Sequence, residues 1–428
     1  MDAATSLSAN RVTSALEEGL RAIVTSKFVR QASAADSVAG VRSQVVVEPG
    51  SEQELAKVLK LADEAGLAVV PRGGGTKLAW GNAPARADLI LSTARLNRVL
   101  EHAWADLTVT VEVGCTIGKL QETLAKRGQR LALDALWPEH ATIGGVLSTN
   151  DSGALRLRFG SLRDLIIGAT LALPDGTLAS SGGKVVKNVA GYDLPKLATG
   201  ALGTLGVITR AVFRVHPLPK ETRTLACACD DMAEAQRLMF AVQDSTLAHS
   251  ALQVRCSRSA RPHVDVLFEA TRAGLDAQTA QLKSLASSKH FADSTFDARQ
   301  ELYSGAKSNA ARAAIAKFSA LPAQIANTIE MLPSLCAEGV GWSAAVQATG
   351  IGCLALQGEM PAMEAAFLSF RANLESAGGS LVVHQAPAVV SRMEAWGNGG
   401  DALPLMRAVK QQFDPKSTLN PGRFVGGI

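Results

Sequence analysis

A run of three glycines carries the clearest chemical signal in the chain. It follows a β-branched stretch and lies within the segment Pro71-Arg72-Gly73-Gly74-Gly75-Thr76. Glycine has no Cβ, so its backbone can adopt positive φ and present N–H groups to an anion at close range, while the proline stiffens the end of the preceding strand. The segment therefore predicts a phosphate-binding turn. A glycine-rich turn without a ligand is the alternative that the segment alone leaves open.

The elements around this turn are predicted to form a β-α-β unit over residues 45–78. Val45–Val47 has the pattern of a strand, and Ser51-Glu52-Gln53-Glu54 is a capping box that opens a helix ending at Ala65. The strand Ala68–Val70 then leads into the three glycines. The turn would lie at the carboxyl end of a strand, where ligands of α/β units bind.

Glycine is also dense between residues 136 and 217, across segments that have the pattern of strands rather than of a polar linker. The runs 165–173 and 206–215 predict two of these strands. No G-x-G-x-x-G follows the first strand, and the P-loop-like segment 114–120 has leucine where a magnesium-binding Ser or Thr would stand. A dinucleotide would therefore bind through a fold other than the Rossmann fold.

Composition and charge describe a globular chain without a nucleic-acid signature. The 428 residues are 47% hydrophobic and 19% charged, which is enough for two or three packed domains. The formal charge of +4 is the balance of 43 basic and 39 acidic residues without long single-sign blocks, and only 2 tyrosines are present. Both features argue against a nucleic-acid partner.

The six cysteines have no regular spacing and predict reduced thiols in the cytoplasm, with Cys227 and Cys229 on one buried face of a strand. No C-x₂-C run supplies thiolates for an iron–sulfur cluster, so we expect no cluster in this chain. The amino terminus lacks a signal-peptide pattern, and no run of about eighteen uncharged apolar residues predicts a transmembrane segment. Any association with the inner membrane would be peripheral and through partners.

Three further motifs follow the glycine turn in order: Pro138-Glu139-His140-Ala141-Thr142-Ile143-Gly144-Gly145, Lys187-Asn188-Val189-Ala190-Gly191-Tyr192-Asp193-Leu194 and Gly203-Thr204-Leu205-Gly206-Val207-Ile208-Thr209. Together the four motifs resemble the FAD-binding domain of the vanillyl-alcohol oxidase and p-cresol methylhydroxylase (PCMH) superfamily. The tail Phe413–Arg423 is similar to the carboxyl-terminal signature of its D-2-hydroxyacid dehydrogenase branch. The resemblance is close over residues 45–217 and loose over residues 218–428.

This resemblance implies FAD as the cofactor, with its pyrophosphate on the glycine turn. The residues implied to bind FAD are Pro71, Arg72, Gly73, Gly74, Gly75, Thr76, Pro138, Thr142, Ile143, Gly144, Gly145, Gly203, Thr204, Gly206, Val207 and Ile208. Many members attach FAD covalently through a histidine that follows the glycine turn. Thr76 stands at that place here, so non-covalent FAD is expected, and Cys115 is the alternative for a covalent link.

The resemblance and the order of predicted elements describe an α+β chain, with a two-subdomain PCMH-type FAD-binding domain followed by a ferredoxin-like α+β cap domain. Residues 1–40 would form a leader helix and linker, 41–217 the FAD-binding domain, 218–404 the cap domain, and 405–428 a segment returning to the FAD-binding domain. Two similar orders of strands and helices, one from residue 222 and one from residue 323, predict a doubled ferredoxin-like sheet in the cap.

The predicted cap domain lacks residues that the catalytic hydroxyacid dehydrogenases of this branch carry. Those enzymes have a Gly-Asp-Gly-Asn-Leu-His-like stretch and a second histidine, used for a metal and for the substrate hydroxyl. No such stretch exists here, no metal is expected, and His384 is the best-placed single candidate for a base. The pattern resembles the FAD-binding accessory subunits of bacterial glycolate oxidases.

That resemblance implies an FAD-dependent oxidoreductase subunit acting on CH–OH groups, in a complex that oxidises glycolate or a similar small 2-hydroxy acid to the 2-oxo acid, glyoxylate. Its partners would be a catalytic flavoprotein subunit and an iron–sulfur subunit that receives the electrons. Two alternatives stay open. One is a free-standing D-2-hydroxyacid dehydrogenase, with Tyr192 or His384 as base; the other is a structural subunit that binds FAD without catalysis.

Overall fold

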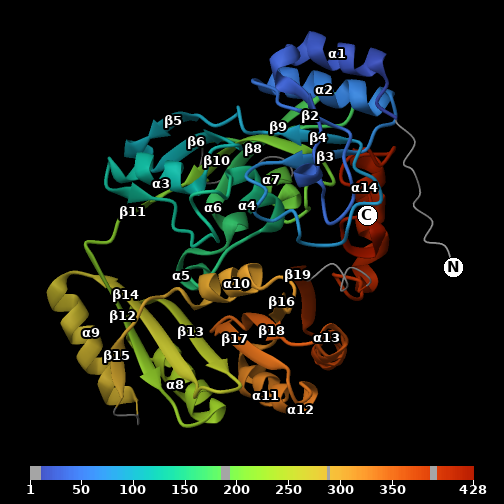
Figure 1. The fold of residues 1–428 in the computed structure, drawn as a ribbon. Helices are drawn as coiled ribbons and strands as arrows, with labels where there is room; N and C mark the ends of the chain where they lie inside the picture. Colours follow the sequence, from blue (N-terminus) through green and yellow to red (C-terminus); the bar gives the residue numbers. More distant parts are fainter. Residues whose placement is uncertain (1–10, 185–192, 287–289, 386–392) are drawn as a thin grey trace.

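The computed structural model describes residues 11–184, 193–286, 290–385 and 393–428, which form two α+β parts, one above the other in Figure 1. The segment Lys187–Tyr192, with the candidate base Tyr192, lies outside the described residues. The mixed helix-and-sheet class predicted from the sequence is confirmed. None of the helices in the described ranges is both long and apolar enough to cross a membrane.

The first sheet has the strand order β1-β2-β4-β3, in which β2 and β3 are both parallel to β4. Its strands are Val29–Gln31 (β1), Val45–Val47 (β2), Val69–Arg72 (β3) and Leu89–Ser92 (β4). Helix α2 (Glu52–Glu64) begins at the predicted cap, where the Ser51 side chain accepts a hydrogen bond from the Glu54 N–H. The predicted β-α-β unit is present, with β4 inserted between its two strands.

The segment before residue 40 is packed into this first sheet. Helix α1 (Ser14–Val24) contacts α2, and its apolar residues are buried in the same cluster as those of β2 and β4. β1 pairs antiparallel with β2 at the sheet edge, and Asp36 forms ion pairs with Arg30 and Arg72. The division at residue 40 stays a prediction, but the segment before it is structurally continuous with the first sheet.

The second sheet has the order β5-β6-β10-β8-β9 and is antiparallel throughout. Its strands are Val99–Ala103 (β5), Thr108–Glu112 (β6), Ile166–Ala172 (β8), Leu178–Gly182 (β9) and Val207–Arg214 (β10). The helices of this region are α3 (Ile117–Ala125), α4 (Ile143–Thr149), α5 (Arg156–Phe159), α6 (Leu162–Leu165) and α7 (Leu194–Ala198). Residues of α3, α4 and β10 share one buried apolar cluster, which fixes α4 against the second sheet.

A short ladder leads from this region to the second part. It consists of β7 (Gln129–Arg130) and β11 (His216–Pro217), which pair antiparallel. Arg130 also forms a two-pronged ion pair with Glu269, at 2.6 Å for both nitrogen–oxygen pairs, across the boundary between the two parts. The ladder and this ion pair hold the two parts together on that side.

The second part, which we call the cap, is built on one eight-stranded sheet with the order β15-β12-β14-β13-β17-β18-β16-β19. The strands are Glu221–Ala228 (β12), His249–Ser257 (β13), His263–Ala270 (β14), Phe291–Asp293 (β15), Ala313–Ser319 (β16), Gly341–Gln347 (β17), Ile351–Gln357 (β18) and Ser380–Gln385 (β19). Strands β12–β15 form one half of this sheet and strands β16–β19 form the other. Within each half the strands lie in the ferredoxin-like order 4-1-3-2, counted along the chain. The two halves meet where β13 pairs with β17. The predicted doubling is confirmed.

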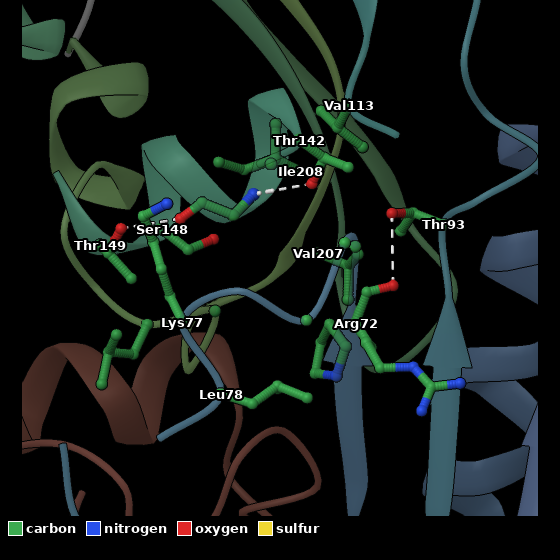
Figure 2. Close-up of a pocket in the computed structure, with 18 of the residues that line it drawn as sticks. Arg72, Lys77, Leu78, Thr93, Val113, Thr142, Ser148, Thr149, Val207 and Ile208 are labelled. Atoms are coloured by element: carbon green, nitrogen blue, oxygen red, sulfur yellow. Dashed lines mark hydrogen bonds between the residues drawn. The ribbon is translucent and has the colours of Figure 1, made fainter. Parts of the chain in front are cut away.

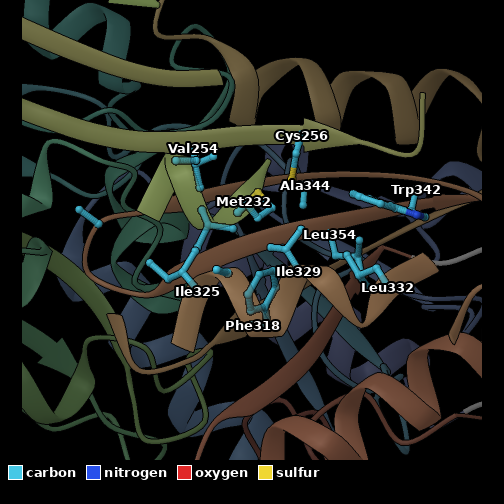
Figure 3. Packing of buried hydrophobic residues seen from close by; sticks show 14 of the residues in the cluster. Met232, Val254, Cys256, Phe318, Ile325, Ile329, Leu332, Trp342, Ala344 and Leu354 are labelled. Carbon is cyan, nitrogen blue, oxygen red and sulfur yellow. The ribbon is translucent and has the colours of Figure 1, made fainter. Parts of the chain in front are cut away.

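Most cap helices cover the face of this sheet that points away from the first part (Figure 1). They are α8 (Met232–Asp244), α9 (Arg272–Leu285), α11 (Ile325–Glu330), α12 (Leu332–Leu335) and α13 (Met360–Ser376). Figure 3 shows Met232, Ile329 and Phe318 in the buried core between these helices and the strands. Helix α10 (Ala298–Ser308) instead lies on the opposite face, between the cap sheet and the first part.

After the cap, the chain returns to the first sheet through α14 (Leu403–Phe413) and the tail that follows it. The Val69 N–H donates to the Thr418 carbonyl oxygen at 2.7 Å, and the Asn420 N–H donates to the Val69 carbonyl oxygen at 2.9 Å. The tail thus extends the ladder beside β3. Residues that follow this pairing are placed next to the glycine turn.

Candidate functional site

The three glycines directly follow β3, and the structure gives each a separate reason to be glycine. A Cβ on Gly73 would lie 2.0 Å from Thr142 Oγ1, and one on Gly74 would lie 1.8 Å from the His140 carbonyl oxygen. Gly75 has a φ of +73°, in the region that favours glycine. None of the backbone N–H groups of residues 73–77 donates to another described residue, so the turn presents unused donors.

A pocket opens in front of this turn, and we call it the turn pocket (Figure 2). Predicted FAD-binding residues that line it are Pro71, Arg72, Gly73, Gly74, Gly75, Thr76, Thr142, Gly144, Gly145, Gly203, Gly206, Val207 and Ile208. They come from the end of β3, from α4 and from the turn before β10, so segments far apart in the sequence meet at one place.

Three predicted residues do not line the turn pocket. The side chains of Ile143 and Thr204 are buried, and the Thr204 hydroxyl donates to the Ala201 carbonyl oxygen at 2.7 Å. Pro138 lines a different cavity and accepts a hydrogen bond at its carbonyl oxygen from Gly118. Cys115, the alternative for a covalent link, is fully buried outside the pocket lining, and burial raises the pKa of its thiol.

The turn pocket also contains residues that were not predicted to bind FAD, and the last two of them belong to the carboxyl-terminal motif: Lys77, Leu78, Thr93, Val113, Ser148, Thr149, Leu202, Asn420 and Arg423. The Asn420 amide donates to the Leu202 carbonyl oxygen at 2.6 Å, while its buried Oδ1 has no partner in the described part of the chain. A hydroxyl-bearing ligand would satisfy that oxygen. The free N–H groups and this unpaired acceptor both fit FAD, which offers phosphate oxygens and ribityl hydroxyls.

A second cavity, of about 330 Å³, lies between the first part and the cap sheet, and we call it the cap cavity. Its lining comes from the segment after β7 and from the cap, and includes Trp137, Arg299, Tyr303, Lys317 and Cys353. A smaller space connects the two sites, because it shares Thr149 and Leu202 with the turn pocket and Lys317 and Ile351 with the cap cavity. The turn pocket, this connecting space and the cap cavity therefore lie one after another along a path across the boundary.

His384, the candidate base, lies along this path. Its ring stacks on Trp80, with centroids 3.9 Å apart and planes 15° apart, and its Nδ1 is 2.6 Å from the Tyr303 hydroxyl. Burial lowers the pKa of His384 well below its usual value, and Lys317 nearby adds to the effect, so the imidazole is neutral at pH 7. Its Nε2 has no hydrogen-bond partner among the described residues and is free for a ligand.

Lys317 is a cation without a counter-ion. It extends from β16 into both the connecting space and the cap cavity, and it forms no ion pair or side-chain hydrogen bond with any described residue. Burial lowers the pKa of its ammonium group to about 8, and Arg299 and Arg156 act in the same direction. A half-buried cation without an ion-pair partner among the described residues favours an anionic ligand.

A second charged group joins the two parts at the same boundary, and we call it the ion bridge. The Asp151 carboxylate lies 3.2 Å from Lys77 Nζ and also pairs with Arg299 of α10. Burial by itself would raise the pKa of Asp151, but Arg299 and Lys77 outweigh it and hold that pKa well below the usual value. The carboxylate is therefore ionised and shared between the two cations.

Comparison with protein families finds matches for two segments of the chain. Residues 43–182 match the family described as FAD binding domain, and residues 388–424 match the C-terminal domain of FAD linked oxidases. The chain therefore carries an FAD binding domain and the C-terminal domain of FAD linked oxidases over these two segments. FAD is its cofactor, and the chain is an FAD-dependent oxidoreductase. Whether FAD is attached covalently stays a prediction.

Two curated relatives are similar to this chain over most of its length. It is 26% identical over 421 residues to "Glycolate oxidase subunit GlcD" of Bacillus subtilis, which covers 89% of this chain and 88% of the relative. It is 28% identical over 417 residues to a D-lactate dehydrogenase of Archaeoglobus fulgidus, covering 89% and 91%.

Solved structures share the fold of this chain. p-Cresol methylhydroxylase with substrate bound aligns with a TM-score of 0.77 at 15% identity over 95% of both chains. Alkyldihydroxyacetonephosphate synthase aligns with a TM-score of 0.75 at 18% identity, over 95% of this chain and 85% of that one. The predicted PCMH-type fold is confirmed.

Proposed function

We propose that FAD lies with its phosphates against the backbone N–H groups of residues 73–76 and its remaining length along the turn pocket. The unused donors of that turn and the unpaired Oδ1 of Asn420 support this placement. The residues predicted from the motifs would form the walls. Pro138, Ile143 and Thr204 would act through packing, because they do not line the pocket.

We further propose that a small 2-hydroxy acid of the glycolate class binds where the cap cavity meets the connecting space, beside Lys317. The observation that carries this proposal is that the connecting space is lined both by Lys317, a half-buried ammonium without an ion-pair partner among the described residues, and by the neutral His384. The substrate carboxylate would pair with Lys317, and its hydroxyl would donate to His384 Nε2. Both functional groups of a 2-hydroxy acid would then have partners.

The residues of this chain would handle the proton of the reaction. FAD, when bound, supplies the acceptor for the hydride that leaves the carbinol carbon, which yields the 2-oxo acid. His384 would take the hydroxyl proton at Nε2, while Tyr303 holds the ring through Nδ1. Trp80 and Trp137 form apolar walls that exclude water from this place.

We propose that the electrons then leave through a complex with a catalytic flavoprotein subunit and an iron–sulfur subunit. The relative named as a glycolate oxidase subunit supports this assembly. A second candidate is a free-standing dehydrogenase for a somewhat larger acid. The D-lactate dehydrogenase relative and a cavity of about 330 Å³ favour it.

Single-turnover kinetics test the assignment of the site. Anaerobic mixing of the FAD-loaded chain with glycolate or D-lactate should reduce the flavin, and His384→Asn should slow that step about a hundredfold while FAD remains bound. His263→Asn is the matched control, because this histidine is bonded to the Arg261 carbonyl oxygen at the far end of β14. An unchanged rate of flavin reduction in His384→Asn would show that His384 is not the base.

Reoxidation of the reduced chain separates the two candidates. The complex predicts fast reoxidation by the iron–sulfur subunit and slow reoxidation by soluble dyes. A free-standing dehydrogenase predicts sustained turnover with a dye and no partner. A flavin that no 2-hydroxy acid reduces would leave a structural role for the bound FAD.

A further inference from the structure

Lys77 is a buried cation in the turn pocket that the proposed chemistry at Lys317 and His384 does not use. It directly follows the glycine turn, and its side chain is only 4% exposed. Figure 2 shows this side chain reaching toward Thr149 at the end of α4. Thr149 also lines the space that leads to the cap cavity, so Lys77 marks the end of the turn pocket nearest the cap.

Burial lowers the pKa of Lys77, while the ion pair with Asp151 acts in the opposite direction and fixes the position of the ammonium group. Its Nζ lies 3.2 Å from Asp151 Oδ2 and 5.6 Å from the ring centroids of both Trp80 and Trp137. Asp151 is shared with Arg299, so the ion bridge has two positive charges and one negative charge. The bridge therefore carries an excess positive charge in a buried site, where electrostatic interactions are strong.

The position of Lys77 indicates which part of bound FAD its positive charge would lie near. Residues 73–76 are proposed to hold the phosphates, and the substrate is proposed to bind where the cap cavity meets the connecting space, so the reactive ring of FAD has to lie between them. Lys77 stands on that side of the pocket. We propose that Lys77 stabilises the negative charge that FAD gains on two-electron reduction, and that Asp151 limits this effect by sharing its carboxylate. This inference rests on the proposed placement of FAD and of the substrate, but its test needs bound FAD alone.

Sulfite affinity and midpoint potential of the bound flavin test the proposal without any substrate. Sulfite binding bleaches flavin absorption and is favoured by a cation close to the ring. Lys77→Met should weaken sulfite binding by at least about tenfold, which corresponds to a midpoint potential about 30 mV lower for a two-electron couple. Lys77→Arg should stay close to the wild type. Lys60→Met removes the same charge from an exposed site on α2 and should change neither quantity.

Asp151→Asn gives a result of opposite sign. It removes the negative charge between Lys77 and Arg299, so sulfite binding should become at least about threefold tighter. A purely structural role for the bridge would move both variants in the same direction. Sulfite affinity within twofold of the wild type in Lys77→Met would overturn the proposal. If that variant does not retain FAD, an unchanged or weaker sulfite affinity in Asp151→Asn would overturn it.

Discussion

Substitution of Gly74 by alanine probes the FAD site with a single added carbon. The new Cβ would lie 1.8 Å from the His140 carbonyl oxygen and 2.9 Å from its carbonyl carbon. These are backbone atoms, so no side-chain rotation can relieve the overlap. An ordinary contact needs about 3.4 Å, so the turn and the 138–142 segment must separate by roughly 1.5 Å.

That separation widens the place where the phosphates are proposed to bind. Overpacking at a well-packed site costs about 1–3 kcal/mol, and here it also moves the N–H groups of the turn away from their ligand. We expect the FAD dissociation constant of Gly74→Ala to rise at least a hundredfold, which corresponds to about 2.7 kcal/mol. The apoprotein should still fold, because the sheet and its apolar clusters do not include Gly74.

Isothermal titration of apoprotein with FAD measures this loss, and circular dichroism checks folding. Gly305→Ala is the control: it adds the same carbon to α10, where no atom lies within 4 Å of the new Cβ. That variant should keep its FAD affinity and gain slightly in stability, because alanine favours helices. FAD binding by Gly74→Ala within threefold of the wild type would refute the assignment of the turn.

Three further predictions concern the ammonium groups of Lys317 and Lys410. Lys317→Met should raise the KM for glycolate about thirtyfold, measured by steady-state oxidation, because the substrate carboxylate loses its only proposed counter-ion. Since the pKa of Lys317 is about 8, the cation is present below that pH, so the wild-type KM should rise as the pH passes through 8 to 9, and Lys317→Met should not show this rise. Lys410→Met leaves the buried Asp414 carboxylate without the ammonium now 2.6 Å away, and should lower the unfolding free energy by about 3 kcal/mol in urea denaturation.

The glycine turn and its β-α-β unit could be predicted because their signals are local. Each of these signals predicts its local structure from a few neighbouring residues: three successive glycines predict a turn, a capping box predicts a helix start, and β-branched runs predict strands. The motif at 138–145 could be placed through its resemblance to a family. Not every residue of the motifs lines the pocket, because one side of the short helix α4 packs into the core. Ile143 lies on that buried side.

Helix α10 and strand β16 were missing from the predicted cap, although they carry Arg299, Tyr303 and Lys317. The α10 sequence contains Gly305, and β16 is rich in alanine, which has low strand propensity. The strand forms because β18 and β19 pair with both of its edges. Tertiary pairing overrides local preference there, so sequence patterns give no signal.

The ion bridge could not be predicted for a different reason. Its members, Lys77, Asp151 and Arg299, come from distant parts of the chain, and none stands in a motif that suggests a partner. The fold of the first part brings Lys77 to Asp151, and the docking of α10 onto that part adds Arg299. The same holds for the pair of Tyr303 and His384, in which the sequence indicated one member alone.

The absorption spectrum of the FAD-loaded chain during anaerobic titration with glycolate tests the central claim most directly. The account predicts bleaching of the flavin band with one equivalent of glyoxylate formed for each flavin reduced, and no bleaching with acetate, which lacks the hydroxyl group. A flavin that stays oxidised with glycolate and with D-lactate, in protein that binds FAD stoichiometrically, would contradict a hydroxyacid site in this chain.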